Sequence, residues 1–245
     1  IVYFFSTEVP LIVYEYRRYL VYAFVLFFLC TGIGVISAKY DIDFVRLILG
    51  DSYVNMTLEN IKDGNPVAVY KSGSNWGGFI AITMNNLYVG AQCFIWGIFL
   101  GIGTFYIMLQ NCIMLGSFQY FFYQEGVFWE SVRGIWIHGS MEIFAIVIET
   151  AAGFILGASI LFPKTYSRLN SFKIGFKNGL KIFLSTMPFT IAAGFLEGFV
   201  TRYALEMPNW LNVIIILGTL SLISFYFLIF PFIVHKKLKA LPLKP

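Results

Sequence analysis

The dominant pattern along the chain is a series of long apolar stretches separated by short polar segments. These stretches are residues 20–38, 87–109, 143–162, 182–200 and 213–234. Each is about as long as the roughly 20 residues that a membrane-spanning helix requires. Because lipid offers no hydrogen-bond partner to the backbone, we expect helices in these stretches rather than strands. The pattern therefore predicts an all-α, polytopic helical membrane bundle with at least five spans.

Composition strengthens this prediction and argues against a soluble domain and a nucleic-acid-binding protein. Hydrophobic residues make up 58% of the chain and charged residues only 12%, whereas soluble domains carry about 25% charged residues. The net charge of +4 comes from short basic segments beside the apolar stretches, so we expect no nucleic-acid partner. The three cysteines have no metal-binding spacing and are expected to be buried packing residues.

Basic residues indicate the orientation and the number of crossings. Arg17 and Arg18 precede the first apolar stretch, residues 164–181 contain a basic cluster, and the C-terminal tail contains another. The positive-inside rule places all three groups in the cytoplasm. Five crossings cannot satisfy this, but six can. We therefore favour a sixth crossing in residues 111–129, which is polar enough to require shielding by protein or to be a re-entrant pair of half-helices.

The same topology divides the chain into segments. Residues 1–18 are predicted to be a cytoplasmic juxtamembrane segment and residues 19–245 a helical membrane domain. Within the domain, residues 39–85 form the only long hydrophilic stretch, which is expected to be an extracytoplasmic loop. Residues 45–49 and 53–61 have brief amphipathic patterns that favour short helices on the membrane face.

Four ionisable side chains interrupt the apolar stretches: His138, Glu142, Glu149 and Glu197. A charge at the bilayer centre costs about 2.5–3.5 kcal/mol on insertion scales, so such residues normally face the bundle interior or a water-filled cavity. At about 100° per residue, the first three share one face of a helix. We predict an intramembrane polar seam. Its members are His138, Glu142, Glu149, Glu197, Asn111, Thr201 and Arg202.

Three interpretations of the seam remain open. The polar groups can hydrogen-bond one another and hold helices together. They can instead line a proton or ion pathway. A metal site is disfavoured by the single histidine and the lack of another nitrogen or sulfur ligand nearby, so we predict no metal and no cofactor. The usual hydrolase motifs are missing from the sequence, and we expect no enzymatic activity.

Three glycine pairs with a spacing of four lie in the apolar stretches, at residues 97 and 101, 153 and 157, and 194 and 198. Such pairs allow two helices to approach closely. They favour either a homodimer or close contacts within the chain, and the spacing alone does not separate the two.

Several motifs together resemble the stage II sporulation protein M family. They are GIFLGIGT at residues 97–104, Asn111, HGSME at residues 138–142 and AAGFLEGFVT at residues 192–201. The resemblance covers roughly residues 14–230, and its most specific parts are His-Gly-x-x-Glu and Glu-Gly-Phe-Val-Thr. Residues 47–60 are similar to a loop of family members from the Bacteroidetes group, and the chain resembles such a member without its N-terminal extension.

The resemblance implies a multi-pass protein of the bacterial inner membrane with both termini in the cytoplasm. Family members from spore formers anchor peptidoglycan-degrading proteins, which implies a non-enzymatic scaffold with the lipid bilayer and other envelope membrane proteins as partners. His138, Glu142, Glu197 and Asn111 match family positions, whereas Glu149 departs from them. The alternative function is a transporter or permease component with a proton- or ion-linked pathway along the seam.

Overall fold

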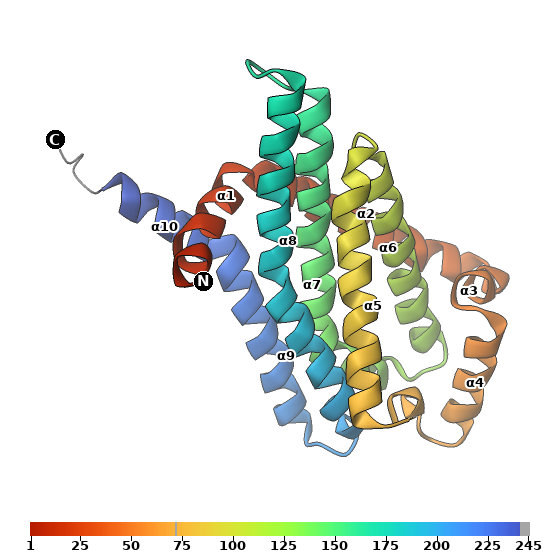
Figure 1. The fold of residues 1–245 in the computed structure, drawn as a ribbon. Helices are drawn as coiled ribbons and strands as arrows, with labels where there is room; N and C mark the ends of the chain where they lie inside the picture. The colour runs from red at the N-terminus through yellow and green to blue at the C-terminus, as the bar shows by residue number, and fades with distance from the viewer. Residues whose placement is uncertain (72, 241–245) are drawn as a thin grey trace.

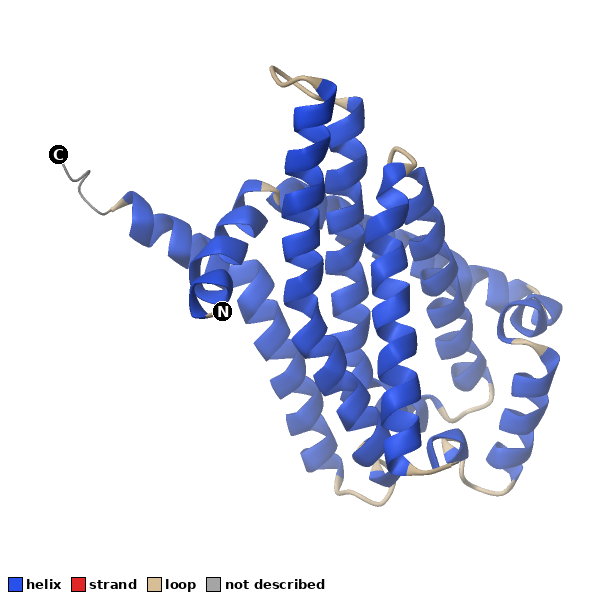
Figure 2. Ribbon diagram, in the orientation of Figure 1, coloured by secondary structure: helices blue, strands red, loops and turns tan. Residues whose placement is uncertain are grey.

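Long helices packed side by side make up the computed structural model, which describes residues 1–71 and 73–240 (Figures 1 and 2). No strand occurs among these residues. The α-helices are α1 (Val9–Glu15), α2 (Arg17–Tyr40), α3 (Ile42–Leu49), α4 (Asp51–Lys62), α5 (Asn75–Ile95), α6 (Ile102–Gln124), α7 (Phe128–Leu161), α8 (Arg168–Phe199), α9 (Asn209–Ser224) and α10 (Phe230–Lys239). Short π- and 3₁₀-helices are η1 (Phe4–Glu8), η2 (Ala68–Lys71), η3 (Trp96–Ile98), η4 (Thr201–Tyr203) and η5 (Phe225–Ile229).

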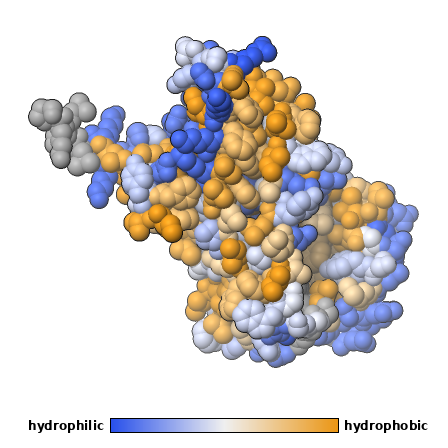
Figure 3. Space-filling model, in the orientation of Figure 1, coloured by the Kyte–Doolittle hydropathy of each residue, from blue (hydrophilic) through white to orange (hydrophobic). Residues whose placement is uncertain are grey.

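Five helical segments are long and apolar enough to cross a membrane, which confirms the helical membrane bundle. They are Arg17–Tyr40, Asn75–Ile98, Phe128–Leu161, Arg168–Phe199 and Asn209–Lys239. The last combines α9, η5 and α10. Apolar residues cover much of the face seen in Figure 3, and hydrophilic residues gather at the α7–α8 turn and around α3 and α4.

One predicted span is wrong, because residues 87–109 contain a reversal of the chain. Leu100 has φ 56° and Gly101 has φ 84°, and these left-handed conformations end the 3₁₀ turn η3 and start α6. Helix α6 then runs back beside α5 (Figure 1). The turn is as apolar as the helices on either side of it, so hydropathy could not reveal it.

The predicted sixth crossing corresponds to α6, which is not among these five segments and has different bounds from those predicted. Helix α6 begins at Ile102 rather than near residue 111, and a turn at Gly126, with φ 77°, separates it from α7. Helix α5 begins at Asn75, inside the stretch expected to be a loop. Helices α5, α6, α7 and α8 alternate in direction in Figure 1.

Helix α7 is the centre of the bundle. It packs most extensively on α8 and also contacts α2, α5, α6 and α9. In the most apolar 18-residue section of α7, 67% of the residues are buried, compared with 11% in the corresponding section of Asn209–Lys239. Side chains on nearly all faces of α7 therefore meet protein, whereas most residues in the apolar part of Asn209–Lys239 lie at the surface of the bundle.

Glycines set the distance between α7 and the α5–α6 turn. Gly97 lies against the backbone of Gly153, and Gly157 lies against the backbone of Gly101. A Cβ added to Gly153 would collide with the carbonyl oxygen of Cys93. Two of the predicted glycine pairs thus pack on each other within one chain.

The third glycine pair likewise allows α8 and α5 to approach each other closely. Gly194 lies against the side chain of Thr83, and Gly198 lies against the Asn75 carbonyl and Phe79. The close helix contacts predicted from glycine spacing are therefore found inside the chain. A homodimer remains a separate prediction.

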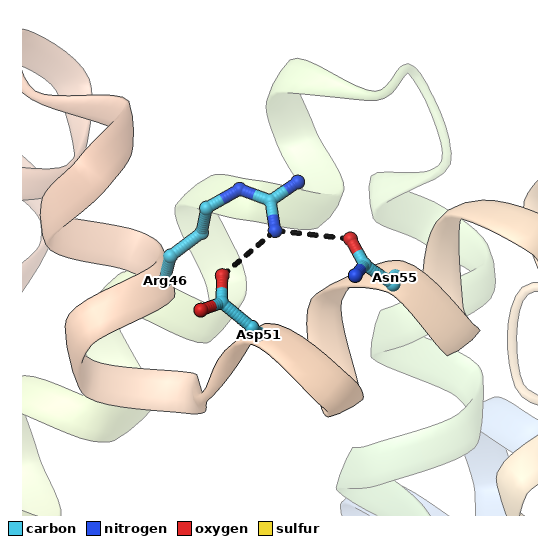
Figure 4. Close-up of polar contacts among 3 residues, drawn as sticks. All are labelled: Arg46, Asp51 and Asn55. Carbon is cyan, nitrogen blue, oxygen red and sulfur yellow. Dashed lines mark hydrogen bonds and ion pairs between the residues drawn. The ribbon is translucent and has the colours of Figure 1, made fainter.

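The two short amphipathic helices are confirmed as α3 and α4, which pack on α6 at the edge of the bundle. Val45 and Val54 are buried with Phe121 and Phe122 of α6. Arg46 joins the two helices, because its Nη1 donates to Asp51 Oδ1 and Asn55 Oδ1, both at 2.9 Å (Figure 4). These contacts hold α3 and α4 as one unit.

Replacement of Gly153 by alanine tests the α7 contacts. We expect Gly153→Ala to lower the apparent free energy of unfolding by about 1–3 kcal/mol, because a methyl group must be forced into packed backbone. Thermal unfolding in detergent measures this, with a thiol-reactive dye reporting exposure of the three buried cysteines. Gly218→Ala is the control, since a Cβ there meets nothing within 4 Å. Equal stability of both variants would contradict the role given to Gly153.

Candidate functional site

A buried histidine on α7 is held between two residues from the end of α8. His138 is 5% exposed. Its Nε2 lies 3.6 Å from Glu197 Oε2 and its Nδ1 lies 3.0 Å from Thr201 Oγ1. Helix α8 ends at Phe199, and the short 3₁₀ turn η4 follows, which turns the Thr201 hydroxyl back toward α7. The two ring nitrogens therefore have different polar neighbours.

Glu142, one helical turn beyond His138, completes a compact cluster. One donor atom each from His138, Glu142 and Glu197 lies within 4.8 Å of the other two. Asn86 of α5 interacts with the Glu142 carboxyl. Glu142 Oε2 and Asn86 Nδ2 are both buried without a well-formed hydrogen bond in the described chain. We call His138, Glu142 and Glu197 the polar cluster.

A cavity of about 410 Å³, here the α5–α8 cavity, reaches the polar cluster. All three cluster side chains line it, and α5 supplies the rest of the wall with Ala81, Ile82, Asn85 and Asn86. Ala81 and Asn85 are exposed. The cluster is therefore accessible from the surface of the bundle, although His138 itself is buried.

A second cavity, of about 390 Å³, lies against α6 and is called the α6–α7 cavity. His138 and Glu142 line this cavity too, together with Asn111 and Tyr53. Asn111 Nδ2 donates to the Ile107 carbonyl at 2.8 Å. Tyr53 lies on α4, and burial raises the pKa of its phenol to about 12. Two side chains of α7 thus separate two cavities.

Glu149 is remote from both cavities although it shares a helix face with His138. It is 1% exposed and accepts a hydrogen bond from Thr186 Oγ1 at 2.6 Å. Its carboxyl also lies where a Cβ at Gly90 would be. The carboxyl is consequently enclosed between α5, α7 and α8.

The predicted seam is therefore divided in the structure. His138, Glu142, Glu197 and Thr201 come together, and Asn111 borders the α6–α7 cavity. Arg202 Nη2 instead donates to the Gly73 carbonyl at 3.4 Å. The sequence analysis did not include Asn86 or Thr186 in the seam. Two consecutive asparagines, at 85 and 86, in an otherwise apolar segment could have indicated Asn86.

The arrangement offers one imidazole and two carboxyl groups to the same space. Such groups can exchange a proton or bind a cation. The nearby Ser140 hydroxyl points elsewhere, since it lies 2.6 Å from Thr219 Oγ1 of α9. Ser140 and His138 thus do not form a nucleophile and base pair in this structure.

Comparison with known proteins identifies one family. A protein-family model described as stage II sporulation protein M matches residues 23–202. The matched region contains the polar cluster, both cavities and the glycine contacts of α7. Neither the comparison with curated proteins nor the comparison with solved structures gave a match.

The enclosed carboxyl of Glu149 leads to a stability prediction. Thr186→Val removes the hydroxyl that donates to Glu149, and we expect a loss of about 1–3 kcal/mol because a buried polar group loses its partner. The measurement is thermal unfolding in detergent. Thr190→Val is the matched control, since the Thr190 hydroxyl makes only a long 3.4 Å contact with the Thr186 carbonyl. A loss of stability in Thr190→Val as large as that in Thr186→Val would contradict the role given to the Thr186 hydroxyl.

Proposed function

The chain belongs to the stage II sporulation protein M family, and from that premise we propose that it is a non-enzymatic scaffold of the bacterial inner membrane. In this proposal it anchors or organises peptidoglycan-remodelling machinery of the cell envelope. Its membrane helices fix its position in the bilayer, and α3 and α4 present a surface to partners outside the cytoplasm.

The observation that carries this proposal is the packed section of α7 beyond the polar cluster. Glu149, Ala151 and Ala152 are all at most 1% exposed, and Gly153 then meets the Cys93 carbonyl. A further cavity of about 570 Å³ lies at the Leu161–Arg168 end of the bundle and shares no lining residue with the α5–α8 or α6–α7 cavity. A packed section between the cavities favours an anchor over a channel.

The distribution of charge supports the proposed orientation. Arg17 and Lys164 line the cavity near the α7–α8 turn. Helix α4 lies toward the other end of the bundle, and α3 lies nearer its middle (Figure 1). Under the positive-inside rule the first end faces the cytoplasm. The exposed side of α4 then faces the cell wall. It carries Asp51, Ser52, Asn55, Met56 and Glu59.

A transporter is the second candidate, and one observation favours it. Carboxyl groups of Glu142 and Glu197 line the α5–α8 cavity, which opens at the surface. Intramembrane carboxyl groups with access to water are characteristic of proton and ion pathways. A transport cycle would need the packed section around Glu149 to open.

Proton flux in proteoliposomes separates the two candidates. With an imposed pH gradient, we expect vesicles containing the full chain to leak protons no faster than empty vesicles, because the packed section of α7 blocks the interior. Glu142→Gln should leave this rate unchanged. A flux above that of empty vesicles that disappears in Glu142→Gln would overturn the scaffold in favour of the transporter.

Site-specific cross-linking tests the partner surface. A photo-reactive amino acid in place of Met56, which is 38% exposed on α4, should cross-link peptidoglycan hydrolases in intact cells. The same amino acid in place of Trp129, which is 72% exposed at the start of α7, is the control and should not. Mass spectrometry identifies the adducts. Hydrolase adducts at both positions, or at neither, would contradict the proposed role of α4.

A further inference from the structure

The polar cluster has the donor set of a cation site. Two carboxyl groups and one imidazole from α7 and α8 converge in the membrane domain, with their donor atoms within 4.8 Å of one another. We infer that His138, Glu142 and Glu197 bind a divalent transition-metal cation such as Zn²⁺ or Mn²⁺. The inference does not depend on the scaffold role, since a bound metal would join helices in either candidate function.

The spacing of the donor atoms fits such an ion after small side-chain movements. Zn²⁺ lies about 2.0–2.2 Å from nitrogen and oxygen ligands, so two ligands in tetrahedral geometry are roughly 3.4 Å apart. His138 Nε2 and Glu197 Oε2 are already 3.6 Å apart. Glu142 is only partly buried and borders open space on both sides of α7. Rotation of its side chain brings the third oxygen to the same point.

The surroundings of His138 prepare it to act as a ligand. Its Nδ1 lies within hydrogen-bond distance of the Thr201 hydroxyl. When Nδ1 donates to that oxygen, Nε2 presents a lone pair toward Glu197. A ligating histidine characteristically has its second nitrogen held by a polar group in this way. Thr201 is therefore assigned a positioning role.

A buried amide nitrogen without a well-formed hydrogen bond provides an independent observation, although the oxygen of the same amide accepts from Asn85 Nδ2 at 3.3 Å. Asn86 is 8% exposed, lines the α5–α8 cavity beside the cluster, and has a buried Nδ2 without a hydrogen bond in the described residues. Rotation of the amide by about 180° exchanges its nitrogen and oxygen. Its oxygen would then face the cluster as a fourth ligand. The cavity volume of about 410 Å³ also leaves room for water to complete the coordination.

Charge and ligand type favour a transition metal over other cations. Two ionised carboxylates at one buried point repel each other, and a divalent ion balances both charges. Ca²⁺ prefers six to eight oxygen ligands, and Mg²⁺ keeps several waters in an octahedron of oxygens. An imidazole nitrogen beside two carboxylates suits Zn²⁺, Mn²⁺ or Fe²⁺.

Metal binding by the purified full chain tests the inference. After treatment with a chelator and dialysis, the protein in detergent is titrated with Zn²⁺ and, separately, with Mn²⁺ by calorimetry, and bound metal is measured by elemental analysis. We expect about one ion per chain and a thermal stabilisation that rises with metal concentration. Glu142→Gln and Glu197→Gln should each weaken binding at least about tenfold.

Two controls separate a lost ligand from a misfolded protein. Glu149→Gln removes a buried carboxyl from the same helix, and Glu130→Gln removes a partly buried carboxyl near the start of that helix. Both variants should bind metal as the wild type does. Each variant is first shown to unfold cooperatively without metal. The inference is overturned if the wild type binds neither ion, or if both cluster variants bind as tightly as the wild type. Stronger binding of Ca²⁺ or Mg²⁺ than of Zn²⁺ and Mn²⁺ would also overturn it.

Discussion

Direct backbone contact between α7 and the α5–α6 turn is the constraint on which the rest of the bundle depends. In lipid, helices gain little from burying apolar side chains, so they associate through close packing and interhelical hydrogen bonds. Small residues permit that packing at successive levels of α7. Gly153 meets the α5 backbone, Gly157 meets the turn, and Gly179 of α8 lies against the Ala152 carbonyl. Helices α5 and α8 are therefore held on α7 along much of its length.

This constraint also places the polar cluster. Gly194 and Gly198 bring α8 against α5, and Glu197 lies between these two glycines in the sequence. Its carboxyl is consequently directed toward His138 on α7 rather than toward lipid. Thr201 follows in the short turn η4, which packs against α7. Close packing fixes the backbone here, while the Glu142 side chain borders the α5–α8 cavity.

Helical periodicity was sufficient to predict part of this site. It placed His138 and Glu142 on one face, and their neighbours from α8 followed from the polar pattern of that helix. Periodicity also placed Glu149 on the same face, yet Thr186 and Gly90 enclose that carboxyl away from the others. The single histidine of the seam argued against a metal site. A count of histidines could not show that carboxyl groups of two helices converge beside it. The reversal at Leu100 escaped hydropathy because an apolar turn and an apolar helix have the same composition.

The apolar α5–α6 turn has a consequence for how the protein enters the membrane. Residues 72–124, which include both helices of that hairpin, contain no Asp, Glu, Lys or Arg. Loop charges orient helices during insertion, so this hairpin carries no signal that retains its tip on either side. Its orientation must come from charged residues in neighbouring segments, which include Arg17 and Arg18 before α2 and the basic loop between α7 and α8. The orientation of the hairpin is thus coupled to that of the charged segments on either side of it.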